Sequence, residues 1–168
     1  MKNTSIIIVI LLSILGIGCK KIHCPAFPVE FVNTYLPYYE EKSLSFFYNN
    51  DTLSSVVSRI HTSKEEFYSK NCDCSCSADY YFLTDNNLLS CDIAFDEAGY
   101  YGYLHIKANA ISFYKDFKDI NLFTTNDYTV FGDTIFLNNV DGGEARVVKG
   151  KGLVSYTTAD GEEWKLVE

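Results

Sequence analysis

The chain has 168 residues, of which 47% are hydrophobic and 21% charged, and its formal net charge is −8. These values are typical of a single globular domain and argue against a wholly disordered chain. A nucleic-acid-binding domain usually carries a basic stripe on one face, and this acidic sequence shows none. We therefore expect one globular unit that does not bind nucleic acid.

Residues 1–18 have the layout of a secretory signal peptide. Lys2 provides a positive start, an apolar run follows over residues 6–15, and the small residue Gly18 precedes Cys19. The apolar run is too short for a transmembrane helix, which needs about 20 residues. We therefore expect this segment to be removed and the remainder of the chain to be exported.

The sequence Leu15-Gly16-Ile17-Gly18-Cys19 resembles the lipobox of bacterial lipoproteins, although Leu stands four residues before the Cys, where three is usual. The resemblance implies that the Cys19 thiol carries a diacylglycerol and that its amine carries a further acyl group such as palmitate. Two or three acyl chains hold a protein stably at a membrane, whereas one chain is marginal. Residues 19–28 would then form an acylated tether. An ordinary signal peptide followed by an incidental Cys is the alternative.

The residue after the modified Cys bears on the destination of a lipoprotein. An Asp at this place often means retention in the inner membrane, so Lys20 implies the outer membrane, with the periplasmic or the cell-surface side left open.

Several short segments of the mature chain also point to a family. They are Cys24-Pro25-Ala26-Phe27-Pro28, Leu36-Pro37-Tyr38, Leu44-Ser45-Phe46, Asn50-Asp51-Thr52-Leu53, Gly152-Leu153-Val154 and Asp160-Gly161-Glu162-Glu163-Trp164-Lys165-Leu166. Through these segments and Cys19-Lys20-Lys21 the mature chain resembles small secreted lipoproteins of Bacteroidota-type bacteria. That group implies no particular activity.

Residues 29–168 are expected to form a single, mainly β domain. Val29 to Tyr35 lies between two prolines and suits a short helix, because proline starts a helix well and ends one. The rest alternates between short apolar-polar runs and Asn, Asp or Gly turns, which predicts roughly ten antiparallel strands. The expected strands are 43–48, 52–60, 78–84, 88–95, 100–107, 110–114, 127–131, 134–137, 144–149, 153–158 and 162–167, and the expected loops include 62–77 and 115–126. The predicted fold class is an antiparallel meander that forms a sandwich or a partly closed barrel.

Five cysteines remain after Cys19, and disulfides are their expected state in an exported protein. They are Cys24, Cys72, Cys74, Cys76 and Cys91. Residues two apart on a strand lie near the upper limit of Cα separation for a disulfide, so bridges within residues 72–76 would be strained. We expect two of those three thiols to bond Cys24 and Cys91. Each bridge would contribute about 2–4 kcal/mol by restricting the unfolded chain.

A metal site is the alternative use of these thiols. Three closely spaced thiolates together with His61 or His23 have the chemistry to bind Zn²⁺ or Cu(I). Zinc sites usually show Cys-x-x-Cys spacing, however, and exported thiols tend to oxidise. We therefore expect no metal and no other cofactor.

The sequence contains none of the common catalytic motifs, neither a Gly-x-Ser-x-Gly elbow, a His-Glu-x-x-His helix, a phosphate loop nor a dinucleotide fingerprint. We therefore expect no catalytic residues and a non-enzymatic domain, with an enzyme of unrecognised type as an alternative. Tyrosines are abundant, and Tyr supplies rigid amphipathic contact area, although aromatics are also ordinary sheet-forming residues. Tyr101, Tyr103 and His105 share one face of an expected strand and are the candidate contacts. The predicted function is binding of an envelope protein or an external ligand such as a glycan.

Overall fold

The structure is a computed structural model that describes residues 29–68, 74–96, 101–117 and 131–167; the side chains of residues 64–68, 74–78, 95, 96 and 101 are not described. These residues form one helix, α2 (Val29–Tyr35), and ten strands. The strands are β1 (Ser43–Tyr48), β2 (Asp51–Tyr68), β3 (Cys74–Thr84), β4 (Leu89–Asp96), β5 (Tyr101–Ala108), β6 (Ile111–Asp116), β7 (Thr134–Asn138), β8 (Glu144–Val148), β9 (Gly152–Thr157) and β10 (Glu163–Leu166). The prediction of a mainly β fold with a short helix near its start is confirmed. The strand expected at 127–131 lies outside the described residues except for Phe131.

The strands form a meander that closes into a barrel. Each strand pairs with the next one in antiparallel fashion, and β10 pairs with β1 through Phe46 opposite Leu166. Among the described residues, the pairing between β6 and β7 is the shortest in the barrel, with Tyr114 opposite Asn138 as its register pair. A closed barrel leaves no sheet edge in its circuit open to pairing with another chain.

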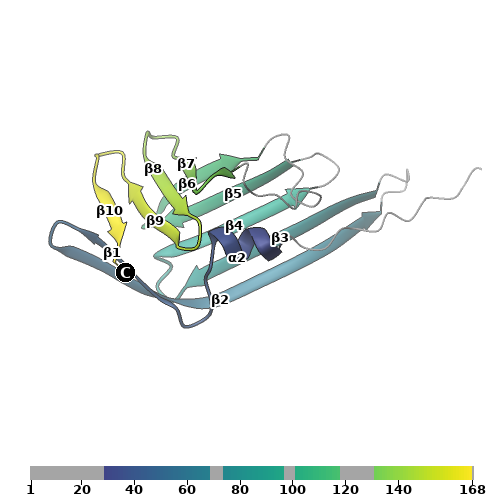
Figure 1. The fold of residues 1–168 in the computed structure, drawn as a ribbon, viewed down its shortest axis with the longest axis horizontal. Helices are drawn as coiled ribbons and strands as arrows, with labels where there is room; N and C mark the ends of the chain where they lie inside the picture. The colour runs from purple at the N-terminus through teal and green to yellow at the C-terminus, as the bar shows by residue number, and fades with distance from the viewer. Residues whose placement is uncertain (1–28, 69–73, 97–100, 118–130, 168) are drawn as a thin grey trace, which may run out of the picture.

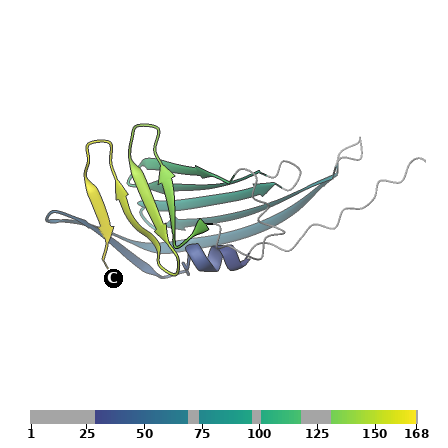
Figure 2. The ribbon, with the colours of Figure 1, turned by 45° about the horizontal axis from the view of Figure 1, so that its top comes forward.

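The barrel is uneven in length. The long strands β2 to β5 lie side by side as one curved wall, and the short strands β7 to β10 stand over one end of it (Figure 1). Helix α2 lies beside the turn between β8 and β9, next to the wall (Figures 1 and 2). The helix therefore occupies a position where the short strands no longer cover the inner face of the long ones.

The long β2–β3 hairpin departs from the sequence prediction. Residues 62–77 were expected to form a loop, but β2 continues to Tyr68, and β3 already begins at Cys74. Their backbones pair from Arg59 opposite Leu83 to Tyr68 opposite Cys74. Backbone pairing between two strands does not require apolar side chains, so the polar sequence of this segment concealed its strand structure. Lys115 and Asp116, also expected in a loop, likewise belong to β6.

The core fills the barrel with residues from alternate positions of the strands. Leu89, Cys91 and Ile93 of β4 and Leu104 and Ile106 of β5 are all buried, as the alternation predicted. The other buried strand residues with apolar or aromatic side chains are Leu44, Phe46, Val57, Tyr80, Phe82, Ala108, Phe113, Ile135, Leu137, Ala145, Val147, Leu153, Tyr156 and Trp164. Interior alternation of this kind gives a packed barrel.

Candidate binding site

Helix α2 is attached to the barrel through one of its sides. Phe31 and Tyr35 are four residues apart and therefore lie on the same face of the helix. The Phe31 ring packs edge-on against Phe117, with 5.7 Å between ring centroids, and against Phe131, with 5.3 Å. Phe117 and Phe131 also contact each other at 5.0 Å. This aromatic cluster is a specific contact that fixes the position of the helix.

Hydrogen bonds hold the same region of the chain. The Tyr35 hydroxyl donates to the Gly132 carbonyl at 2.7 Å, and the Gly150 amide donates to the Thr34 carbonyl at 2.7 Å. Just after the helix, the Tyr38 hydroxyl accepts a hydrogen bond of 2.7 Å from the Leu153 amide. These bonds connect α2 and the residues that follow it to the turns before β7 and β9.

Gly152 allows Tyr38 to lie close to the β8–β9 turn. Its φ angle of +87° favours glycine, and a Cβ at this position would lie 2.5 Å from the Tyr38 hydroxyl oxygen. The Tyr38 ring in turn packs against Phe82 of β3, with centroids 4.4 Å apart. Tyr38 thus spans the space between the short strands and the long wall.

A pocket of about 350 Å³ lies between α2 and the β2–β3 wall. Val29, Val32 and Asn33 of the helix have the i, i+3, i+4 spacing that places them on one face. The pocket is lined by these three residues together with Tyr38, Ile60, Thr62, Ser63 and Tyr80. The lining is mainly apolar, and its volume is within the range of small-molecule sites.

Tyr80 is one of the lining residues, and its hydroxyl is buried in the barrel without a partner, as are the Tyr156 hydroxyl and the Trp164 indole nitrogen. The Tyr80 side chain is 2% exposed, and among the described residues the hydroxyl has no hydrogen-bond partner. Burial raises the pKa of Tyr80 above its ordinary value, and the Cys91 thiol nearby adds to the rise. The hydroxyl therefore stays protonated and neutral at physiological pH. An unsatisfied buried hydroxyl is costly, so this group requires an explanation.

The disulfide expected at Cys91 is not formed. The thiol is free and buried, and burial raises its pKa well above the ordinary value. Cys91 of β4 lies opposite Phe82 of β3. Phe82 is six residues from Cys76 along β3, so Cys91 and Cys76 are roughly 20 Å apart. A disulfide needs Cα atoms within about 7 Å, so neither Cys76 nor Cys74, which lies further along the strand, is in reach. The wrong assignment of residues 62–77 to a loop led to this expectation.

The other cysteine predictions stay predictions. Cys24 and Cys72 lie outside the described residues, and only the backbones of Cys74 and Cys76 are described. Within the part of the chain whose side chains the structure describes, no group of three His, Cys, Asp or Glu residues is arranged to hold a metal ion.

The predicted contacts on β5 lie on the outer face of the barrel. The Tyr103 hydroxyl donates to the Asp92 carboxylate at 3.0 Å, and the Tyr103 ring stacks on Tyr114 with 5.4 Å between centroids. The His105 ring lies 6.3 Å from Tyr114. The structure thus brings Tyr103 and His105 together as cross-strand packing on an open surface, while the side chain of Tyr101 is not described. His61 is exposed on β2, and His23 lies outside the described residues.

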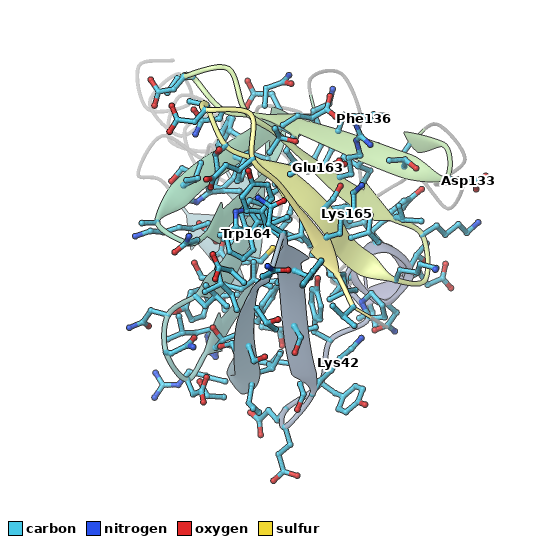
Figure 3. The ribbon with its side chains drawn as sticks, turned by 90° about the vertical axis from the view of Figure 1, so that its left-hand side faces the viewer. Lys42, Asp133, Phe136, Glu163, Trp164 and Lys165 are labelled. Carbon is cyan, nitrogen blue, oxygen red and sulfur yellow. The ribbon has the colours of Figure 1, made fainter. Side chains whose placement is uncertain are left out.

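A second, more open depression of about 670 Å³ crosses the outer face of β7 to β10. Phe136, Glu163 and Lys165 are labelled on this surface in Figure 3. Glu163 pairs with Lys165 at 3.0 Å and lies 3.9 Å from Arg146, which also bonds Glu144 at 2.9 Å. The depression is therefore lined by exposed charged groups of both signs.

Comparisons with protein-family models, with curated proteins and with solved structures find no match to this chain. Among the described residues, no helix has the length and apolar character needed to cross a bilayer. The candidate site must therefore be interpreted from its own geometry.

We predict that Tyr80→Phe raises the free energy of unfolding by about 1 kcal/mol at neutral pH, because it removes a buried hydroxyl that has no partner. The matched variant Tyr38→Phe should lower the same quantity by about 1–2 kcal/mol, since the Leu153 amide loses its acceptor. Urea unfolding of both variants measures the two changes. Destabilisation of similar size in both would mean that the Tyr80 hydroxyl has a partner after all.

The pH dependence provides a further readout of the same variant. The raised pKa of Tyr80 gives a stability contribution that is complete below the unfolded-state pKa of about 10 and is lost as the pH rises through the higher folded-state value. The fall in stability above pH ~10 should therefore be shallower in Tyr80→Phe than in the parent chain.

Proposed function

We propose that this chain is an exported lipoprotein, anchored at the outer membrane through Cys19, whose barrel is a non-catalytic domain that binds a small ligand between α2 and the β2–β3 wall. The observation that carries the proposal is the pocket itself. It is largely apolar, and Asn33, Thr62 and Ser63 add a few polar groups to its lining. Apolar pockets with a few convergent polar groups are typical small-molecule sites.

The attachment of α2 supports binding to a preformed site. The aromatic cluster of Phe31, Phe117 and Phe131 and the hydrogen bonds of Thr34 and Tyr35 are made by groups that do not line the pocket. The helix therefore does not need a ligand to hold its position. A site that is organised before binding loses less conformational entropy when the ligand enters.

The lining favours binding over acid-base or nucleophilic catalysis. The described residues around the pocket supply aliphatic side chains, two tyrosines, an amide and two aliphatic hydroxyls. None of these lining residues is His, Cys, Asp, Glu, Lys or Arg. General acid-base catalysis needs a titratable group within hydrogen-bond reach of the substrate, with a pKa near the working pH.

The expected anchor would keep the pocket close to a membrane. Val29 lines the pocket and stands ten residues after Cys19. A chain of ten residues spans at most about 35 Å when fully extended. A ligand that partitions into the bilayer would therefore be concentrated near the pocket.

We predict that Cys19→Ala abolishes incorporation of an alkynyl palmitate in producing cells and releases the chain from the membrane fraction, because two or more acyl chains provide stable anchoring. Cys24→Ala, at the nearest other cysteine, should retain both the label and the membrane association. Labelling and fractionation of the two variants measure this. Membrane association without the label in Cys19→Ala would contradict the lipid anchor.

We predict that Thr62→Trp weakens binding of the neutral fluorescent probe N-phenylnaphthylamine by at least about tenfold. Thr62 is exposed, lies opposite Tyr80 and lines the pocket, so an indole there would fill it. His61→Trp is the matched control, because the adjacent exposed residue points to the other face of β2. The titration uses the mature chain with Cys19→Ser, which has no acyl group and keeps every described element. Equal binding by both variants, or no binding by the parent chain, would refute this use of the pocket.

A further inference from the structure

We propose that the outer face of β7 to β10 is a self-complementary surface through which two copies of this chain associate as a two-fold dimer. The inference does not depend on the pocket beside α2. It follows from the order of the charges on this face, from the aromatic rings beside them and from the net charge of the whole chain.

Two strands of this face carry the same order of charges. β8 holds Glu144 and Arg146 two residues apart, and β10 holds Glu163 and Lys165 at the same spacing (Figure 3). Residues two apart on a strand project from one face, and these four side chains are 37–65% exposed. β8 and β10 run in the same direction, because each pairs in antiparallel fashion with β9 between them. The acids therefore form one row across the strands, and the cations form a second row about 7 Å from it.

The row of cations is bounded by exposed aromatic rings. Ser155 of β9 lies opposite both Arg146 and Lys165, and it is 7% exposed because longer side chains flank it. Phe136 lies opposite Arg146 on one side of the row, and Phe47 of β1 lies opposite Lys165 on the other. The two phenyl rings are 47% and 44% exposed. Burial of such rings against another molecule would supply free energy of association.

The two rows are complementary to the same rows of a second copy. A two-fold axis that runs across the strands between the rows places the cations of one copy over the acids of the other. Arg146 then faces Glu144 of the second copy, and Lys165 faces Glu163 of the second copy. Each charge keeps the partner in its own chain, at 2.9 Å for Arg146 and 3.0 Å for Lys165, and gains another across the interface. Complementary charges of this kind fix the register of an interface.

The net charge of the chain favours a second copy at this face. The chain carries a formal net charge of −8, and like charge of this size keeps copies apart. The two acids and two cations of the rows sum to zero. Copies that approach through these rows therefore meet without a local excess of like charge.

The small size of the face limits the affinity. Five neighbouring strands, β1 and β7 to β10, span about 19 Å, and five residues of a strand span about 17 Å. The resulting footprint of roughly 300 Å² is below the ~800 Å² per partner of a standard stable interface. We therefore expect a weak dimer, with a dissociation constant on the order of 100 µM.

Sedimentation equilibrium of the mature chain with Cys19→Ser measures the association. One double variant carries Arg146→Glu and Lys165→Glu, which make both rows acidic. The other carries Glu144→Lys and Glu163→Lys, which make both rows basic. Each double variant is measured alone and in an equimolar mixture with the other.

The matched control carries Arg59→Glu and Lys107→Glu, which change the net charge as much as the acidic variant does. Both residues are exposed, on β2 and β5, away from the proposed interface. In 0.15 M salt, where charges are screened beyond about 8 Å, the control should dimerise within about threefold of the parent affinity.

We expect each double variant alone to associate at least about tenfold more weakly than the parent chain, because like charges then face each other. The equimolar mixture should associate more tightly than the parent, since an acidic face then meets a basic one. Phe136→Ser, which leaves every charge in place, should weaken association about 3–10-fold through lost apolar burial.

Three outcomes would overturn the inference. A parent chain that stays monomeric at about 1 mM, tenfold above the expected dissociation constant, would leave the face to a different partner. Equal weakening in the control and in the acidic variant would mean that only net charge acts. A mixture that does not associate would mean that the order of the charges is not recognised. N-phenylnaphthylamine binding tests the pocket separately, so none of these outcomes affects the proposed function.

Discussion

The packing of Phe31 and Tyr35 against the barrel is the interaction on which the rest of the site depends. A seven-residue helix is not stable alone in water, so α2 exists because tertiary contacts hold it. Those contacts include the rings of Phe117 and Phe131 and hydrogen bonds at Gly132 and Gly150. Val29, Val32 and Asn33 of the same helix form one side of the pocket. The same contacts stabilise the fold and leave the cavity open.

The unpaired hydroxyl of Tyr80 is a feature of the barrel interior that stability alone does not explain, and Tyr156 and Trp164 share it. Phenylalanine at this position would keep the ring and avoid the cost of burying a hydroxyl without a partner. Residues that reduce stability without an evident structural gain are often found at functional sites, where a ligand supplies the missing interaction.

Much of the fold was predictable because it depends on local patterns. Period-two alternation identified the faces of β4 and β5, and prolines bounded the helix. The polar end of the β2–β3 hairpin was missed, since its strands are joined by backbone pairs that leave no apolar pattern. The bridge expected at Cys91 failed for the same reason, because strand register and not spacing along the chain sets the distance to Cys76.

The candidate site was only partly readable. The positions of Tyr80 and Phe82, two residues apart, could have indicated that Tyr80 points inward with the core. That its hydroxyl lacks a partner, and that α2 stands off the wall beside it, depends on contacts between segments far apart in the sequence. No local pattern encodes such contacts. The aromatic face of β5, which the alternation did reveal, is an outer surface packed across strands.

A crystal structure of the mature chain with N-phenylnaphthylamine bound tests the central claim most directly. The account predicts electron density for the dye between α2 and the β2–β3 wall, beside Thr62 and Ile60, with α2 in place. Dye bound elsewhere, or the helix packed down onto Ile60 and Tyr80 with no space left between them, would contradict it.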